Sequence, residues 1–151
     1  MLVSAWLVFL IQPMLGRMIL PRLGGAASVW ITVSLFFQIA LLAGYFYAHV
    51  VSARLTPRLQ MAVHAILALS AVFLLPVAIP ETWAPPADRP PQGDLILMMV
   101  LTVGLPFVVV SATAPLLQRW YSLTGAKDAG DPYFLYAASN LGSLAALILY
   151  P

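Results

Sequence analysis

Polar side chains inside long apolar runs are the residues of this sequence best placed to do chemistry. Gln12, Gln38 and Asn140 each lie in a stretch that contains no charged residue. Burying an amide without a hydrogen-bond partner costs roughly a few kcal/mol, so each of the three must find one. That partner is either a neighbouring helix, through an interhelical hydrogen bond, or a solute, if the amides line a polar pathway or a substrate pocket.

Two histidines, His49 and His64, flank one short polar turn, and this spacing allows them to approach each other. Two imidazoles fall short of the three protein ligands of a catalytic zinc site. Snorkelling or hydrogen bonding at a membrane interface is therefore the main interpretation. The sequence contains no cysteine, which excludes disulfides, thiolate metal sites and cysteine nucleophiles. We expect no bound metal and no cofactor.

Patterns typical of catalysis are missing from the sequence. No Ser-His-Asp order and no paired carboxylates occur, and every carboxylate lies in a predicted loop or at a helix start. Gly24-Gly25 is the only glycine pair, and no acidic residue follows it as in a nucleotide-binding loop. We therefore expect no enzymatic activity within these residues.

The composition indicates that these side chains are positioned by membrane-spanning helices. Apolar residues make up 62% of the 151 residues and charged residues 8%, with a mean hydropathy of +0.96. Soluble proteins have about 45–50% apolar and about 25% charged residues. The seven basic and five acidic residues give a net charge of only +2 and lie between the apolar runs, so they mark topology and indicate no nucleic-acid partner. This composition predicts an all-α, polytopic membrane protein, whose partners are the lipid bilayer and other transmembrane helices.

We expect a single transmembrane domain over residues 1–151, with about five spans near residues 2–20, 26–51, 57–79, 94–119 and 132–150, because lipid leaves only helices or closed barrels to satisfy the backbone. The proline-rich stretch 80–93 is expected to be an aqueous surface loop. The first apolar run is short of the ~20 residues of a full span. Either this helix is clipped or it continues through Arg17 to Leu20. The clipped helix is favoured, and it predicts a fragment or an N-terminally shortened reading frame. Basic residues, four on one side and three on the other, favour a cytoplasmic N-terminus.

The fourth run, residues 94–119, contains Pro106 and Pro115, and each removes a backbone donor from the helix. We expect a bend at or just before Pro106 and another near Pro115. The hydroxyls of Ser111 and Thr113 are expected to replace the lost bonds, because hydroxyls can bond back to the preceding turn. Such breaks persist in lipid where other helices cover them, so this span should lie against other protein.

Small residues recur every four positions in two runs: Ala40, Gly44 and Ala48, then Ala138, Gly142 and Ala146. This spacing lets helix backbones approach closely in lipid. In the last span we expect Asn140 and the small residues to face the bundle interior, with Leu141, Leu144 and Ile148 facing outward. That arrangement requires neighbours on two sides of the helix. Arg17 and Arg22 are expected at a membrane boundary. The candidate intramembrane polar and packing residues are Gln12, Arg17, Gln38, His49, His64, Gln118, Asn140 and Gly142.

Several motifs occur in an order that resembles a known family. They are Gln12-Pro13, Gly16-Arg17, Leu20-Pro21, Gly24-Gly25, Val29-Trp30, Phe36-Phe37-Gln38, the stretch from Gly44 to His49, Gly104-Leu105-Pro106, the stretch from Ser111 to Gln118 and the stretch from Pro132 to Ser143. Together they resemble the N-terminal membrane region of bacterial spermidine-synthase-like proteins, in which a major-facilitator-like membrane part is fused to an aminopropyltransferase-like domain. The resemblance implies a bacterial inner-membrane location and a link to polyamines. The synthase-like domain is absent from these residues, so none of its catalytic residues carries over.

Two functions are consistent with these features. The first is a structural module that holds a synthase-like domain at the cytoplasmic face. The second is a fragment of a small-solute transporter, in which the broken fourth helix, Gln38 and Asn140 line a path. A weaker alternative is an accessory subunit of a membrane complex. A path for a cationic solute would need an intramembrane carboxylate, and none occurs. The sequence therefore favours the structural module.

Overall fold

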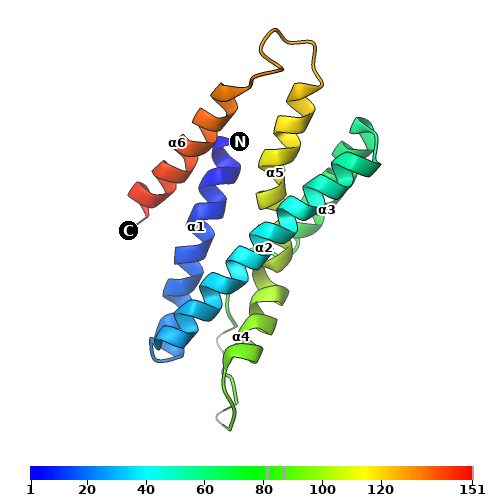
Figure 1. The fold of residues 1–151 in the computed structure, drawn as a ribbon. Coiled ribbons are helices and arrows are strands. Elements are labelled where there is room, and N and C mark those ends of the chain that lie inside the picture. Colours follow the sequence, from blue (N-terminus) through cyan, green and yellow to red (C-terminus); the bar gives the residue numbers. More distant parts are fainter. Residues whose placement is uncertain (81, 87, 151) are drawn as a thin grey trace.

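The computed structural model describes residues 1–80, 82–86 and 88–150, and within these residues the protein is all-helical, with no strand, as the sequence predicts (Figure 1). Residues 81, 87 and 151, two of them in the expected 80–93 loop, lie outside the described part. The elements in chain order are α1 (Leu2–Ile19), the 3-10 turn η1 (Leu20–Arg22), α2 (Ala27–Arg54), α3 (Pro57–Val72), α4 (Gln92–Met99), the π-helical turn η2 (Val100–Gly104), α5 (Leu105–Ser122) and α6 (Tyr133–Leu149).

Three helical stretches are long and apolar enough to cross a membrane: Leu2–Arg22, Ala27–Arg54 and Gln92–Ser122. The helices α3 and α6 are apolar but shorter. Large apolar side chains on the outer faces are widely exposed, for example Leu42 at 68% and Ile148 at 69%. Water would disfavour so much exposed hydrocarbon, whereas acyl chains accept it. The architecture is therefore that of a transmembrane helical bundle.

The segments α4, η2 and α5 form one continuous helical stretch, and the other successive helices run in opposite directions (Figure 1). The central contacts are those of α1 with α6, of α2 with α5 and of α1 with α5, while α3 packs mainly against α5. Gly24 and Gly25 have φ of +74° and +66° in the α1–α2 connector, a left-handed conformation that glycine adopts without strain. At the α2–α3 turn, Pro57 occupies the first turn of α3, where its missing N–H costs nothing.

The third helix is shorter than the sequence predicts. Instead of reaching residue 79, α3 ends at Val72. A proline disfavours helical geometry in the residue before it and cannot donate to the helix itself, so Pro76 prevents continuation. The chain then returns to the bundle. Ile79 is only 5% exposed there and belongs to a core cluster with residues of α1, α2 and α4. Burial of this side chain ties the non-helical segment to the bundle.

The stretch after Ile79 is irregular as expected, yet it is not detached from the protein. Trp83 packs against the same core cluster, and Arg22 Nη1 donates a 2.7 Å hydrogen bond to the carbonyl oxygen of Pro80. An exposed ion pair joins Arg89 to Asp94 in the first turn of α4, with a shortest N–O distance of 2.6 Å. The loop and the α1–α2 connector therefore form one end of the bundle together.

The helix from Gln92 to Ser122 is distorted where Pro106 requires it. The π-helical turn η2 ends two residues before Pro106, which confirms an irregularity at that position. Pro115 lies inside α5, which continues to Ser122, so this proline does not end the helix. Ser111 Oγ and Thr113 Oγ1 do bond back, to the carbonyls of Val108 and Val109 at 2.9 Å each. These are not the carbonyls that the prolines leave unpaired, because Pro115 frees the carbonyl of residue 111 and Pro106 that of residue 102.

The last helix is peripheral, which corrects the expectation of an interior position. Apart from a ring contact between Phe134 and Tyr121 of α5 near the α5–α6 loop, it packs mainly against α1. Gly142 and Ala146 are buried against that neighbour, while Leu141 and Ile148 face outward as predicted. Asn140 is exposed, contrary to expectation. Two residues correspond to about 200° of rotation on a helix, so a single neighbour cannot cover both Gly142 and Asn140.

Candidate functional site

Polar and aromatic side chains from α2, α3 and α5 meet near the α2–α3 turn and form what we call the three-helix cluster: Tyr47, Gln60, His64, Thr113 and Trp120. Gln60 is its anchor, since it is only 2% exposed. Its side-chain Oε1 accepts a 2.9 Å hydrogen bond from Trp120 Nε1, and its Nε2 donates a 2.8 Å bond to the carbonyl oxygen of Leu55. One side-chain amide of α3 therefore binds both Leu55, in the connector that follows α2, and Trp120 of α5.

His64 joins α3 to α5 one turn further along. Its ring is 8% exposed, and its Nε2 lies 3.1 Å from Thr113 Oγ1. The Thr113 hydroxyl also donates a 2.9 Å hydrogen bond to the carbonyl oxygen of Val109. His64 and Thr113 therefore form a polar link between α3 and α5.

Aromatic rings enclose His64 on two sides. The Tyr47 ring stacks on the imidazole with centroids 6.1 Å apart and an interplanar angle of 24°, and the Trp120 ring meets it edge-on at 6.1 Å and 71°. The Tyr47 hydroxyl and His64 Nδ1 are buried and have no hydrogen-bond partner among the described residues. Each unpaired buried group costs about 1–3 kcal/mol, so the cluster owes its stability to its other bonds and to its rings.

Helical spacing explains how these residues come together. Gln60 and His64 are four residues apart on α3 and so share a face, while Thr113 and Trp120 are two turns apart on the facing side of α5. Below the cluster, α2 and α5 touch most closely at Gly44, where a Cβ atom would lie 2.9 Å from the carbonyl oxygen of Val108 and closer still to Ser111 Oγ. The absence of a side chain at this point allows the helices to approach.

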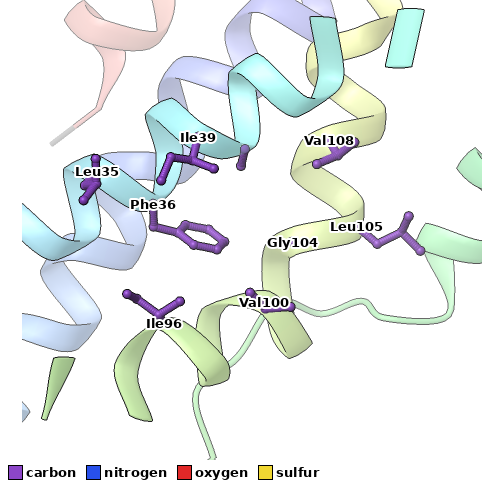
Figure 2. Close-up of a pocket in the computed structure, with 9 residues that line it drawn as sticks. Leu35, Phe36, Ile39, Ile96, Val100, Gly104, Leu105 and Val108 are labelled. Atoms are coloured by element: carbon purple, nitrogen blue, oxygen red, sulfur yellow. The ribbon is translucent and has the colours of Figure 1, made fainter. Parts of the chain in front are cut away.

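Two grooves border these helices, and both have apolar walls. Figure 2 shows one of about 430 Å³ between α2 and the π-helical turn, with Leu35, Phe36 and Val100 among its lining residues. A second, of about 880 Å³, lies between α1, α3 and α5, and Thr113 is the one polar side chain among its lining residues. Neither groove offers the set of polar groups that would bind a small hydrophilic solute.

The structure does not gather the predicted polar residues into one site. Of the eight candidates, His64 and Gly142 are buried, Gln12 and Gln118 are half-buried, and Arg17, Gln38, His49 and Asn140 are exposed. His49 faces outward whereas His64 faces α5, so the two histidines have different surroundings. Among the described residues, no group of three or more His, Cys, Asp or Glu side chains is arranged to hold a metal ion.

Gly142 marks the closest approach between α6 and α1. A Cβ atom there would lie 2.9 Å from the carbonyl carbon of Leu2 and 3.1 Å from its Cα. Because the obstructing atoms belong to the backbone, no side-chain rotation would make room. The small-residue spacing of α6 therefore serves direct packing onto the first turn of α1.

Sequence reasoning missed Gln60 and Trp120 as partners. Both lie near helix ends, where polar and aromatic residues are common at membrane interfaces, so neither stands out in an apolar run. The available signal was the spacing of Gln60 and His64, which places an amide and an imidazole on one face of a single helix. Its partner sixty residues later has no local signature.

Comparisons with known proteins leave the chain without an assigned family, since no family model, curated protein or solved structure matches it.

Proposed function

We propose that this chain is a membrane-embedded helical scaffold of the bacterial inner membrane, and that it holds a soluble, synthase-like domain at the membrane. The observation that carries the proposal is the placement of its polar residues. Gln38 and Asn140, the two amides near mid-helix in α2 and α6, are both exposed. They lie on the outer surface of helices that pack inward against α5 and α1. Amides on two outer faces cannot line one path through the bundle.

The apolar lining of the grooves favours a scaffold function over a transport function. A path for a small hydrophilic or cationic solute needs convergent polar groups and, for a cation, a carboxylate at membrane depth. The two grooves beside α2, α3 and α5 are lined by hydrocarbon, with Thr113 as the exception in the larger one, while Asp94 lies in the wall of a third groove beside Trp83, at the first turn of α4. The hydroxyl of Thr113 is already engaged with Val109 and His64. The hydrogen bonds of the three-helix cluster therefore connect helices to one another.

The charge distribution indicates which side the soluble domain would face. Arg54, Arg58, Arg119 and Lys127 are exposed at the end that holds the α2–α3 turn and the α5–α6 loop. The positive-inside rule favours this end as the cytoplasmic one. A soluble domain on that side would contact these two loops. The synthase-like character of the domain rests on the motif resemblance alone.

A vesicle experiment tests the scaffold against the transporter. The purified chain is reconstituted into phosphatidylethanolamine–phosphatidylglycerol vesicles, and uptake of radiolabelled putrescine and spermidine is measured under an imposed membrane potential. A scaffold predicts uptake equal to that of protein-free vesicles. Saturable uptake above that background contradicts the proposal.

The genomic reading frame beyond residue 151 tests the anchored domain. Because α6 runs away from the basic end, a covalently attached cytoplasmic domain requires an odd number of further spans before it. We expect those spans, followed by a glycine-rich nucleotide-binding segment. A stop codon directly after residue 151, with no interacting synthase-like protein recovered on purification, contradicts this part of the proposal.

A further inference from the structure

The outer face of α2 carries a regular stripe of exposed side chains. It consists of Ile31, Leu35, Gln38, Leu42, Tyr45 and His49, which we call the outer stripe, and every one of these residues is exposed. Their spacings alternate between four and three residues, the 3.5-residue repeat of a left-handed helix pair. The inward face of the same helix, with Ala40, Gly44 and Ala48, is already buried against α5. The outer stripe is therefore a second helix-packing surface that the described chain leaves uncovered.

Gln38 lies near the centre of this stripe and of α2 itself. Its side chain makes no hydrogen bond to any other residue that the structure describes. In a bilayer the middle of α2 lies at the depth where lipid offers no donor or acceptor. An amide exposed at that depth gains from a protein partner that brings a hydrogen-bonding group to the same depth and face.

We propose that a second copy of this chain is that partner, and that the two copies pack α2 against α2 along the outer stripe with their Gln38 side chains hydrogen-bonded to each other. Copies inserted in the same orientation are related by a two-fold axis along the membrane normal. Such an axis places each residue opposite its own equivalent at the same depth. A glutamine amide has both donors and an acceptor, so two of them can bond reciprocally.

The remaining stripe residues fit this arrangement. Leu35 and Leu42 flank Gln38 one turn away on either side, so each amide would be enclosed by leucines of both copies. A polar residue at one core position of a helix pair fixes its register, because any slip leaves the amide unpaired. Leu35 also forms part of the wall of the groove in Figure 2, and a second helix on the stripe would cover that wall.

Disulfide trapping in membranes tests the contact directly, and the absence of natural cysteines makes the background clean. Leu35→Cys and Leu42→Cys are made singly in the full chain, and Leu144→Cys, an exposed position on α6, serves as the matched control. After mild oxidation of native membranes, the two stripe variants are expected to form disulfide-linked dimers, since paired core positions lie within disulfide range. The α6 control is expected to stay monomeric.

The role of the amide is tested with Gln38→Leu, and Asn140→Leu removes the other exposed mid-helix amide as a control. Dimer formation is measured in lipid vesicles at varied protein-to-lipid ratio. Loss of the paired amides is expected to weaken association about threefold to tenfold, the range for interhelical hydrogen bonds in membranes. Asn140→Leu is expected to leave association unchanged, and circular dichroism is expected to give equal helix content for both variants.

Each outcome decides the proposal. Cross-linking confined to the stripe, weakened by Gln38→Leu alone, supports it. Equal cross-linking at Leu144, or none at Leu35 and Leu42, overturns the α2 interface and leaves lipid or a further helix as its cover. Stripe cross-links unaffected by Gln38→Leu overturn the amide pairing. The proposal requires only that α2 spans a membrane, so solute uptake in the vesicle experiment would contradict the scaffold and leave this interface standing.

Discussion

Replacing Gly44 with alanine is expected to destabilise the bundle, although alanine is the better helix former. A Cβ atom at this position would lie 2.9 Å from the carbonyl oxygen of Val108, 3.1 Å from Ser111 Cβ and closer still to Ser111 Oγ. The carbonyl belongs to the backbone of α5 and cannot rotate away, so α2 and α5 must separate at their closest point. Overpacking of this kind costs about 1–3 kcal/mol.

The opposing effect is the helix propensity of alanine, which favours the variant by roughly 0.8–1.0 kcal/mol. Because a backbone atom obstructs the new methyl group, we place the packing cost in the upper part of its range and expect a net loss of about 1–2 kcal/mol. The matched control is Gly104→Ala, where the nearest atom to an added Cβ is 3.8 Å away. There the propensity gain meets no clash, so stability should be unchanged or rise by up to about 1 kcal/mol.

Thermal and denaturant unfolding in detergent micelles, followed by circular dichroism, measures both variants. Adding Ser111→Ala to Gly44→Ala removes the Oγ atom but leaves the Val108 carbonyl in place, so partial rescue is expected, with a coupling of about 0.5–1.5 kcal/mol. The reasoning is refuted if Gly44→Ala is as stable as the parent, or if Gly44→Ala and Gly104→Ala change stability in the same direction by the same amount.

Three further substitutions probe the other contacts. Tyr47→Phe should be neutral or stabilising by about 1 kcal/mol in the same unfolding assay, because it removes a buried hydroxyl without a partner; a clear loss would indicate that the hydroxyl is bonded. Trp120→Phe should destabilise by about 1–3 kcal/mol, because it leaves the buried Gln60 Oε1 unpaired, and Gln60→Leu in that background should restore part of the loss. Gly142→Leu should detach α6 from α1, seen as faster proteolysis after Ser122, and unchanged cleavage would show that the contact with Leu2 does not hold α6.

The start and course of most helices could be read from the sequence because the rules involved are local. An apolar run without charges has to satisfy its own backbone in lipid, which predicts helices beginning and ending close to those of α1, α2 and α6. Gly24 and Gly25 predict a tight connector, and Pro57 predicts a helix start, since each acts through its own backbone torsions. Pro76 acts through the same local rules and ends α3 early, within the expected 57–79 span.

The placement of the polar side chains inside or outside the bundle was decided by the tertiary structure. In the sequence, Asn140 and Gln38 cannot be distinguished from amides that are buried between helices. Their exposure depends on which helices α6 and α2 have as neighbours. Small residues at a spacing of four mark one packing face of these helices, but the rest of each helix is apolar on all sides, so the environment of a polar side chain cannot be derived from its own helix. The bond between Gln60 and Trp120 depends in the same way on α3 and α5 meeting near the α2–α3 turn. The sequence by itself thus determined where the chain is helical and that it belongs in a membrane, and only the packing of helices distant in sequence decided which polar groups are paired inside the bundle and which remain on its surface.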